Sequence, residues 1–139
     1  MIEANRARRA VSRWYLDASA ALELVVQEAE SGALVAAIDE EQPDLVACAL
    51  LETEVRRAAQ QSPALTQAAA SALLDGISLY EVPTSLFREA GLVTGTHLRS
   101  LDALHLAAAI RIGAEAVITY GARMGAAARD AGLVVLAPR

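Results

Sequence analysis

Three acidic residues stand in stretches of the sequence where packing alone would favour apolar side chains. Asp17 ends the run Trp-Tyr-Leu-Asp, Glu54 lies in Leu-Glu-Thr-Glu-Val, and Asp102 opens the nearly apolar segment 101–112. An ionised carboxylate removed from water costs several kcal/mol unless a positive charge neutralises it. Carboxylate oxygens are also the ligands that Mg²⁺ prefers. The pattern therefore predicts a metal site, and a metal that activates water indicates hydrolytic chemistry.

Helical phase distinguishes Glu54 from the neighbouring Glu52. Residues two apart on a helix point in roughly opposite directions, at about 100° per residue. Glu54 falls inside the apolar arc that includes Leu50 and Ala58, whereas Glu52 falls at its margin. We expect Glu54 to be the functional residue and Glu52 to be solvated. The alternative is that Glu54 only pairs with a nearby arginine at the edge of the core.

The other two acids also have simpler interpretations at the starts of helices. Asp102 follows Ser100, a good N-cap, and in the first turn it would interact with the helix dipole. Because that helix has scarcely a polar face, we expect Asp102 to be buried. Asp17 precedes Ser19, whose hydroxyl could cap a helix or hold a metal-bound water. His105 could orient a carboxylate or a phosphate, although a lone histidine on an apolar face is more often a hydrogen-bonded core residue.

These residues have to be positioned by alternating strands and helices. Apolar runs predict strands at 14–17, 45–49, 78–82, 116–120 and 133–137. Helical patterns predict two helices within 19–40, broken near Gly32, and further helices at 50–61, 64–75, 84–91, 100–112 and 122–131. This alternation predicts a three-layer α/β/α fold with a central parallel sheet of four to five strands and helices on both faces.

The expected sheet also predicts where a ligand binds. Open parallel sheets bind ligands beyond the carboxyl ends of their strands, near the point where strand order reverses. Asp17 and position 121 both follow predicted strands. If the first and fourth strands are neighbours, both positions face one crevice, and the starts of helices can bring Glu54 and Asp102 into it.

Composition narrows the classes of function. At 139 residues the chain fits one domain, which we place at 13–139 after an N-terminal extension at 1–12. All 12 cationic residues are arginine, and the absence of lysine excludes Schiff-base and P-loop chemistry. Cys48 is the only cysteine, which excludes an internal disulfide and predicts a buried core residue. We expect no signal peptide or membrane anchor and a cytoplasmic location.

The net charge of −5 does not by itself favour nucleic-acid binding, so local arginines would have to contact a phosphate. Candidates for this contact are Arg56, Arg57, Arg99 and Arg123. For any one of them, a solvated or ion-paired surface position is the simpler interpretation.

With these residues placed, the sequence resembles PIN-domain ribonucleases, specifically the VapC-type toxins of bacterial toxin–antitoxin pairs. The matching motifs are Tyr-Leu-Asp-Ala-Ser-Ala at 15–20, Thr-Glu-Val-Arg-Arg-Ala at 53–58, Leu-Arg-Ser-Leu-Asp-Ala-Leu-His-Leu-Ala at 98–107 and Val-Ile-Thr-Tyr at 117–120. The resemblance implies hydrolysis of RNA phosphodiester bonds with Mg²⁺ or Mn²⁺, a cognate VapB-type antitoxin and a homodimer. It further implies that Asp17, Glu54 and Asp102 are metal ligands and that Ser19 and Thr119 orient ligands or water.

The fourth acid of the family is missing. Where such toxins have an aspartate after Thr-Tyr, this sequence has Gly121. Glycine offers no ligand, so we expect weak binding of a second metal and reduced activity. An inactive module that only binds RNA or antitoxin is therefore the main alternative. Phosphatase or phosphoacceptor chemistry at Asp17 is a third hypothesis, against which the absence of lysine counts.

Overall fold

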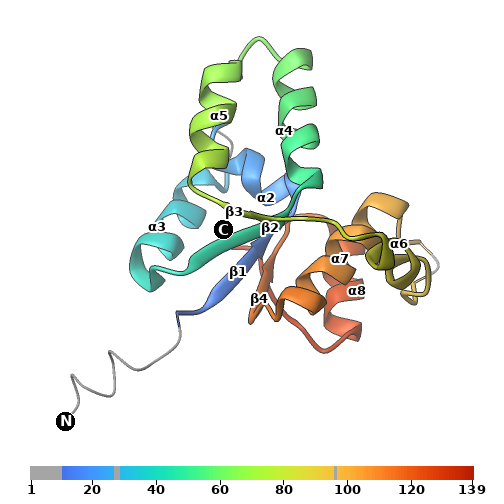
Figure 1. Cartoon of the computed structure of the whole chain (residues 1–139). Helices are drawn as coiled ribbons and strands as arrows, with labels where there is room; N and C mark the ends of the chain where they lie inside the picture. The colour runs from blue at the N-terminus through green and yellow to red at the C-terminus, as the bar shows by residue number, and fades with distance from the viewer. Residues whose placement is uncertain (1–10, 27–28, 96) are drawn as a thin grey trace.

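A computed structural model describes residues 11–26, 29–95 and 97–139, and its elements are labelled in Figure 1. The strands are β1 (Arg13–Leu16), β2 (Asp44–Cys48), β3 (Ser78–Tyr80), β4 (Ala116–Ile118) and β5 (Val134–Leu136). The helices are α2 (Ala18–Glu23), α3 (Ser31–Glu41), α4 (Leu50–Gln61), α5 (Gln67–Asp75), α6 (Thr84–Gly91), α7 (Ser100–Ile112) and α8 (Ala122–Asp130). The proposed extension at 1–12 lies almost wholly outside the described residues.

The five strands form one parallel sheet in the order β3-β2-β1-β4-β5. Tyr15 of β1 pairs with Val46 on one side and with Val117 on the other, so β1 is central. After β3 the chain returns to the other side of β1, and the strand order reverses between β1 and β4. The expected neighbourhood of the first and fourth strands is thus confirmed.

Helices cover both faces of the sheet. Figure 1 shows α2 and α3 on one side and α7 and α8 on the other, with α6 beside α7. In the same view α4 and α5 extend together away from the sheet. The three-layer α/β/α prediction is confirmed, and none of the described helices is long and apolar enough to cross a membrane.

The three central strands provide the middle of the core. Residues 14–16, 46–48 and 116–118 are all buried, as expected for parallel strands that are covered on both faces. Helix α7 packs over them through the continuous buried run 104–109 and ends at Gly113, whose φ of +77° places it in the left-handed region that favours glycine. The apolar character of this helix therefore reflects burial, and its first turn lies at the edge of the core.

Some expected details of the helices differ from the structure, among them the start of the second helix and the cap of α7. The break in the segment 19–40 lies between Glu23 and Ser31, so Gly32 falls inside α3. Ser100 is the first residue of α7 and not its N-cap, because the extended backbone at Arg99 makes that residue the cap. The bounds of α4, α6 and α7 agree with those expected.

Candidate functional site

The three predicted acids line one cavity beside the carboxyl end of β1. Asp17 directly follows β1, Glu54 comes from α4 and Asp102 from the first turn of α7. The cavity has a volume of about 370 Å³. Its wall is completed by Ala18, Ser19, Arg99, His105, Gly121, Ala122, Arg123 and Met124. It lies at the reversal of strand order, where the topology predicts a ligand site.

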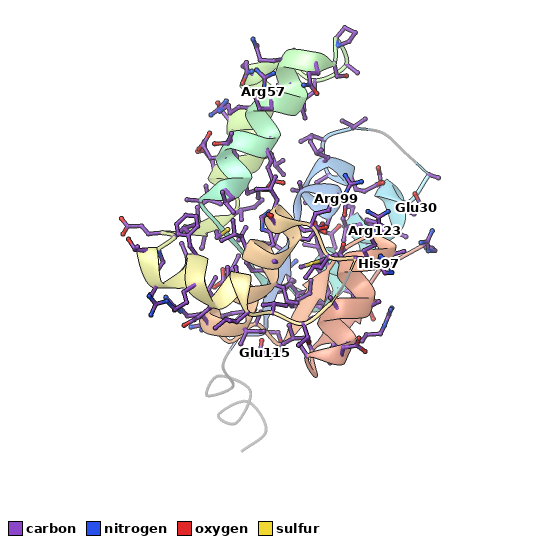
Figure 2. All side chains as sticks on the ribbon, turned by 90° about the vertical axis from the view of Figure 1, so that its right-hand side faces the viewer. Glu30, Arg57, His97, Arg99, Glu115 and Arg123 are labelled. Atoms are coloured by element: carbon purple, nitrogen blue, oxygen red, sulfur yellow. The ribbon has the colours of Figure 1, made fainter. Side chains whose placement is uncertain are left out.

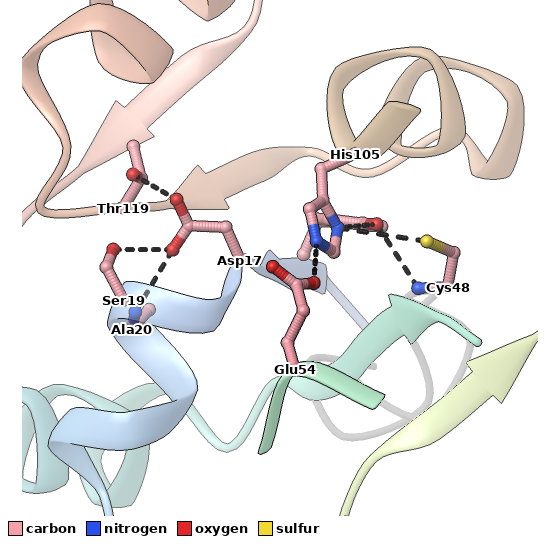
Figure 3. A network of polar contacts seen from close by, with 8 residues as sticks. Asp17, Ser19, Ala20, Cys48, Glu54, His105 and Thr119 are labelled. Carbon is pink, nitrogen blue, oxygen red and sulfur yellow. Dashed lines mark hydrogen bonds and ion pairs between the residues drawn. The ribbon is translucent and has the colours of Figure 1, made fainter. Parts of the chain in front are cut away.

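Asp17 is held by three hydrogen bonds to its carboxylate (Figure 3). Its Oδ1 accepts from the Ser19 hydroxyl at 2.6 Å and from the Ala20 amide at 3.0 Å, and its Oδ2 accepts from the Thr119 hydroxyl. The bond from Ala20 makes Asp17 the N-cap of α2. The side chain is therefore buried in one orientation at the base of the cavity.

Ser19 and Thr119 link Asp17 to the loop that follows β4. Besides donating to Asp17, the Ser19 hydroxyl accepts from the Tyr120 amide at 3.0 Å. The Thr119 hydroxyl likewise accepts from the Gly121 amide at 3.1 Å. Ser19 does not cap α2, since Asp17 has that position. The role of both hydroxyls in orienting a ligand or water stays a prediction.

Glu54 meets a partner that the sequence did not indicate. The carboxylate Oε1 lies 2.5 Å from His105 Nε2, and the Glu54 side chain keeps 21% of its surface exposed. The expected alternative, an arginine partner, is not the contact found. Glu52 instead pairs with Arg56 at 2.7 Å and is 47% exposed, which agrees with its expected solvation.

The pKa of Asp102 is raised in the cavity that it shares with Asp17. Burial and then the neighbouring Asp17 carboxylate raise the pKa of Asp102, while His105 and Arg99 act in the opposite direction. Asp102 is only partly buried, contrary to the expectation that its helix would bury it fully. The reason is its place in the first turn, where α7 emerges from the core into the cavity.

His105 and Tyr15 connect this cavity with the core. The His105 ring is 1% exposed, and its Nδ1 lies 2.6 Å from the Tyr15 hydroxyl and 3.8 Å from the Cys48 thiol. Burial alone would lower the pKa of His105, yet its hydrogen bonds with Cys48 and Glu54 outweigh burial and raise it. The expected core histidine therefore contacts both the core tyrosine and the Glu54 carboxylate.

Tyr15 is the site residue that sequence reasoning missed. It lies in the central strand and is fully buried. A signal was nevertheless present, because a tyrosine hydroxyl in a strand covered on both faces needs a hydrogen-bond partner. Cys48 is buried as expected, and its amide donates to the Tyr15 hydroxyl at 3.2 Å.

Gly121 occupies the N-cap position of α8 at the cavity wall. Its backbone angles, φ −81° and ψ 124°, are open to any residue. A Cβ added there would lie 3.5 Å from Thr119 Oγ1 and 3.8 Å from Met124 Cβ, which are ordinary contacts. The fold therefore has room for an acidic side chain at this position.

Two of the four candidate arginines reach the cavity. Arg99 and Arg123 line it, and Figure 2 shows them near one another and apart from Arg57 on α4. Arg56 is engaged along the α4–α5 pair by Glu52, Gln67 and Ser71. Of the four candidates, Arg99 and Arg123 are therefore the ones that can contact a ligand in this cavity.

The donor types suit a hard divalent cation. In the part of the chain that the structure describes, no three Asp, Glu, His or Cys side chains form a ready-made metal cluster. Mg²⁺ usually keeps several water ligands and needs only one or two carboxylates besides substrate phosphate. Three carboxylates around one cavity meet that requirement, and burial, followed by the neighbouring Asp17 carboxylate, raises the pKa of Asp102. Asp17, Glu54 and Asp102 would hold such an ion.

Comparison with known proteins defines the family. A family model described as "PIN domain" matches residues 14–130. The chain therefore belongs to the PIN-domain family. Within that family, "Ribonuclease VapC46" of Mycobacterium tuberculosis is 37% identical over 126 residues, covering 89% of this chain and 96% of the relative. "Ribonuclease VapC35" of the same species is 33% identical over 129 residues, with the same coverage.

Solved structures share the fold at lower identity. VapC20 of M. tuberculosis, described as a sarcin–ricin loop cleaving toxin, superposes with a TM-score of 0.69 at 16% identity and covers 87% of this chain and 96% of its own. A toxin–antitoxin complex from Klebsiella pneumoniae gives a TM-score of 0.69 at 18% identity, covering 90% and 97%. These likenesses support the three-layer architecture.

Proposed function

We propose that this protein is a metal-dependent endoribonuclease toxin that a cognate antitoxin inhibits. The observation that carries the proposal is the convergence of Asp17, Glu54 and Asp102, from three separate elements, on one cavity at the reversal of strand order. Relatives above 30% identity are named ribonucleases, and structural neighbours include toxin–antitoxin complexes. RNA, an antitoxin of the VapB type and a second copy of the chain are the proposed partners.

The residues have distinct proposed roles. Asp17 and Asp102 bind Mg²⁺ or Mn²⁺, and Glu54 serves as a further ligand or as the base that orients the attacking water. A bound ion of this type lowers the pKa of water and balances charge on the phosphate. Arg99 and Arg123 hold the phosphodiester at the cavity mouth. The expected products carry a 5′-phosphate and a 3′-hydroxyl, and 2′,3′-cyclic phosphate ends would contradict this mechanism.

The first experiment measures cleavage of single-stranded RNA by the wild-type chain and by Asp17→Asn, each with Mg²⁺, Mn²⁺ and EDTA. Cleavage that requires metal and is lost in Asp17→Asn supports the proposal. The amide of asparagine keeps the size of the side chain and removes its charge, so the variant also reports any contaminating nuclease. Metal-independent cleavage, or cleavage by Asp17→Asn at the wild-type rate, contradicts the proposal.

Gly121 supplies a second prediction about this activity. Gly121→Asp adds the absent acid, and we expect faster cleavage at limiting Mn²⁺, by roughly tenfold, the order of effect of one metal-site residue. Aspartate at this position also caps α8, so stability alone could alter the rate. Gly121→Asn is the matched control, because asparagine caps about as well and brings no charge. Equal cleavage rates for the Asp and Asn variants contradict a missing-ligand role for position 121.

Gly121 also favours a second candidate, a module that binds RNA or antitoxin without cleaving. Retained RNA binding by the folded wild-type chain, with no cleavage at any metal concentration, supports this candidate. Recovery of cleavage in Gly121→Asp would then identify the loss of one acid as the cause.

A further inference from the structure

Glu54 stands at the end of a chain of hydrogen bonds that begins deep in the sheet. The Cys48 amide donates to the Tyr15 hydroxyl at 3.2 Å, this hydroxyl lies 2.6 Å from His105 Nδ1, and His105 Nε2 lies 2.5 Å from Glu54 Oε1. The chain joins β2, β1, α7 and α4, and Figure 3 shows it beside the separate hydrogen bonds of Asp17.

The two side chains in the middle of this series of hydrogen bonds, Tyr15 and His105, have little freedom to move. Tyr15 and His105 are 0% and 1% exposed, and their rings meet edge to face with centroids 5.7 Å apart. A buried ring that is packed on its faces and hydrogen-bonded at both nitrogens holds one orientation. The Nε2 atom of His105 is therefore a fixed point on the wall of the cavity.

The direction of the last bond follows from the chemistry of its two groups. An ionised carboxylate only accepts hydrogen bonds, so His105 Nε2 carries the hydrogen and donates it to Glu54 Oε1. This holds whether Nδ1 donates to the Tyr15 hydroxyl or accepts from it. The bond occupies one carboxylate oxygen and leaves Glu54 Oε2 for a ligand in the cavity.

A restraint of this kind has a clear use on α4. Figure 1 shows that α4 extends away from the sheet, and Glu54 is a flexible side chain on it that keeps part of its surface exposed. Asp17 needs no such help, since the Ser19 and Thr119 hydroxyls and the Ala20 amide already orient it. The two acids are thus held by independent sets of contacts.

We infer that His105 is a positioning residue that, anchored by Tyr15, holds the Glu54 carboxylate toward the cavity in the orientation that metal binding and cleavage require. The inference rests on the proposed function for its effect on cleavage. It goes beyond a core role for the histidine, because a core role needs only the contact with Tyr15.

Two substitutions separate the positioning role from a core role. In His105→Gln, the amide nitrogen reaches the place of Nε2 and can still donate to Glu54. In His105→Asn, the shorter amide reaches the place of Nδ1, keeps the contact with Tyr15 and falls short of Glu54. If His105 only stabilises the core, the Asn variant should resemble wild type more closely than the Gln variant does. If His105 positions Glu54, the Gln variant should resemble wild type more closely.

The primary measurement is Mn²⁺ binding by calorimetry, with kcat and KM for RNA cleavage alongside it. We expect His105→Asn to weaken Mn²⁺ binding about 10- to 100-fold, the usual effect of losing a residue that orients a ligand. Its kcat should fall while KM for RNA changes little. His105→Gln should recover most of both. Equal weakening in the two variants, with both folded by circular dichroism, overturns the inference.

A double-mutant cycle tests whether His105 acts through Glu54. On a Glu54→Gln background, His105→Asn should weaken Mn²⁺ binding no further, because the carboxylate it orients is already gone. If His105→Asn weakens Mn²⁺ binding as much on the Glu54→Gln background as on the wild-type background, His105 does not act through Glu54. Tyr15→Phe, which keeps the ring and removes only the anchoring hydroxyl, provides the same comparison if either His105 variant is unstable.

A structural readout keeps this inference separate from the proposed function. If the wild-type chain neither binds Mn²⁺ nor cleaves RNA, the proposed function fails. Crystal structures of the two His105 variants still decide the positioning role: the Glu54 carboxylate should face the cavity in His105→Gln and turn away in His105→Asn. The same Glu54 orientation in both variants overturns the inference whatever the activity.

Discussion

At the scale of single residues, the site places negative charges together at a cost to stability. The three acids line one cavity, and burial together with Asp17 raises the pKa of Asp102. A carboxyl whose pKa is higher in the folded than in the unfolded state destabilises the fold when it is ionised. A bound cation would relieve this cost, so the residues proposed for function limit the stability of the metal-free protein.

We therefore expect Asp102→Asn to raise the melting temperature of the metal-free protein at neutral pH, because the amide keeps the shape and removes the charge. The gain should shrink as the pH falls through the pKa of Asp102, since the wild-type carboxyl is then neutral too. Thermal unfolding in EDTA across this pH range measures it. A melting temperature below that of wild type at neutral pH contradicts the assigned repulsion. Addition of Mn²⁺ should stabilise wild type more than the variant.

At the scale of elements, the strongest connections in the site run between segments distant in the sequence. The Thr119 hydroxyl joins the residue after β1 to the start of α8, through Asp17 and the Gly121 amide. Thr119 is 2% exposed, so both bonds are made by a buried hydroxyl. The position of Asp17 and the start of α8 are thus coupled.

Thr119→Val should lower the free energy of unfolding by about 1–3 kcal/mol, because it leaves a buried carboxylate oxygen and a backbone amide without their partner. Thr119→Ser keeps the hydroxyl and should lose less. Urea unfolding in EDTA measures both.

The control for this loss is Thr66→Ala on α5. The Thr66 hydroxyl caps α5 by accepting from the Ala69 amide at 3.0 Å, and its removal costs about 1 kcal/mol. Thr66 does not line the cavity, so this variant should lose stability with unchanged Mn²⁺ binding. Equal effects of Thr66→Ala and Thr119→Val on Mn²⁺ binding would show that stability alone explains the second.

Elements were predictable where their sequence signals are strong. Segment 50–61 has a marked apolar arc and a stop before Ser62-Pro63, and α4 has these bounds. The start of α3 was not predictable from its pattern, and its first residue, Ser31, donates to the Val26 carbonyl oxygen of the preceding loop at 3.1 Å. Such a contact leaves no periodic pattern in a single sequence.

Part of the site was likewise predictable from the sequence and part was not. The acids were visible as charges within apolar runs, and the strand alternation predicted their meeting at the sheet edge. The contact between His105 and Glu54 joins residues 51 apart and depends on how α7 faces α4. Hydrophobic periodicity predicts which face of each helix is buried. It does not predict which side chain of another helix contacts that face. The structure was needed to show that one histidine contacts both Tyr15 in the core and Glu54 at the cavity.

At the scale of the whole molecule, the net charge of −5 opposes association with RNA, so binding has to rely on local cations. We expect Arg99→Ala and Arg123→Ala each to weaken RNA binding and to reduce the slope of log K against log salt by about 1. Fluorescence anisotropy in EDTA measures binding without metal-dependent cleavage.

Arg57→Ala is the matched control for the arginine prediction. Arg57 is exposed on α4 and does not line the cavity. Its loss should leave the salt slope near that of wild type. A slope that falls equally in all three variants would indicate a diffuse electrostatic attraction in place of a binding site at the cavity.

The hydrogen bond between Asp17 and Thr119 joins residues 102 positions apart. Asp17 is made early in synthesis, but a chain that stops before Thr119 lacks the group that holds one of its oxygens, and a chain that stops before β4 lacks the strand beside β1. The cavity is therefore complete only when the chain has been made past β4 and Thr119. A chain that ends between Asp102 and β4 carries every acid of the proposed site and still lacks the site itself.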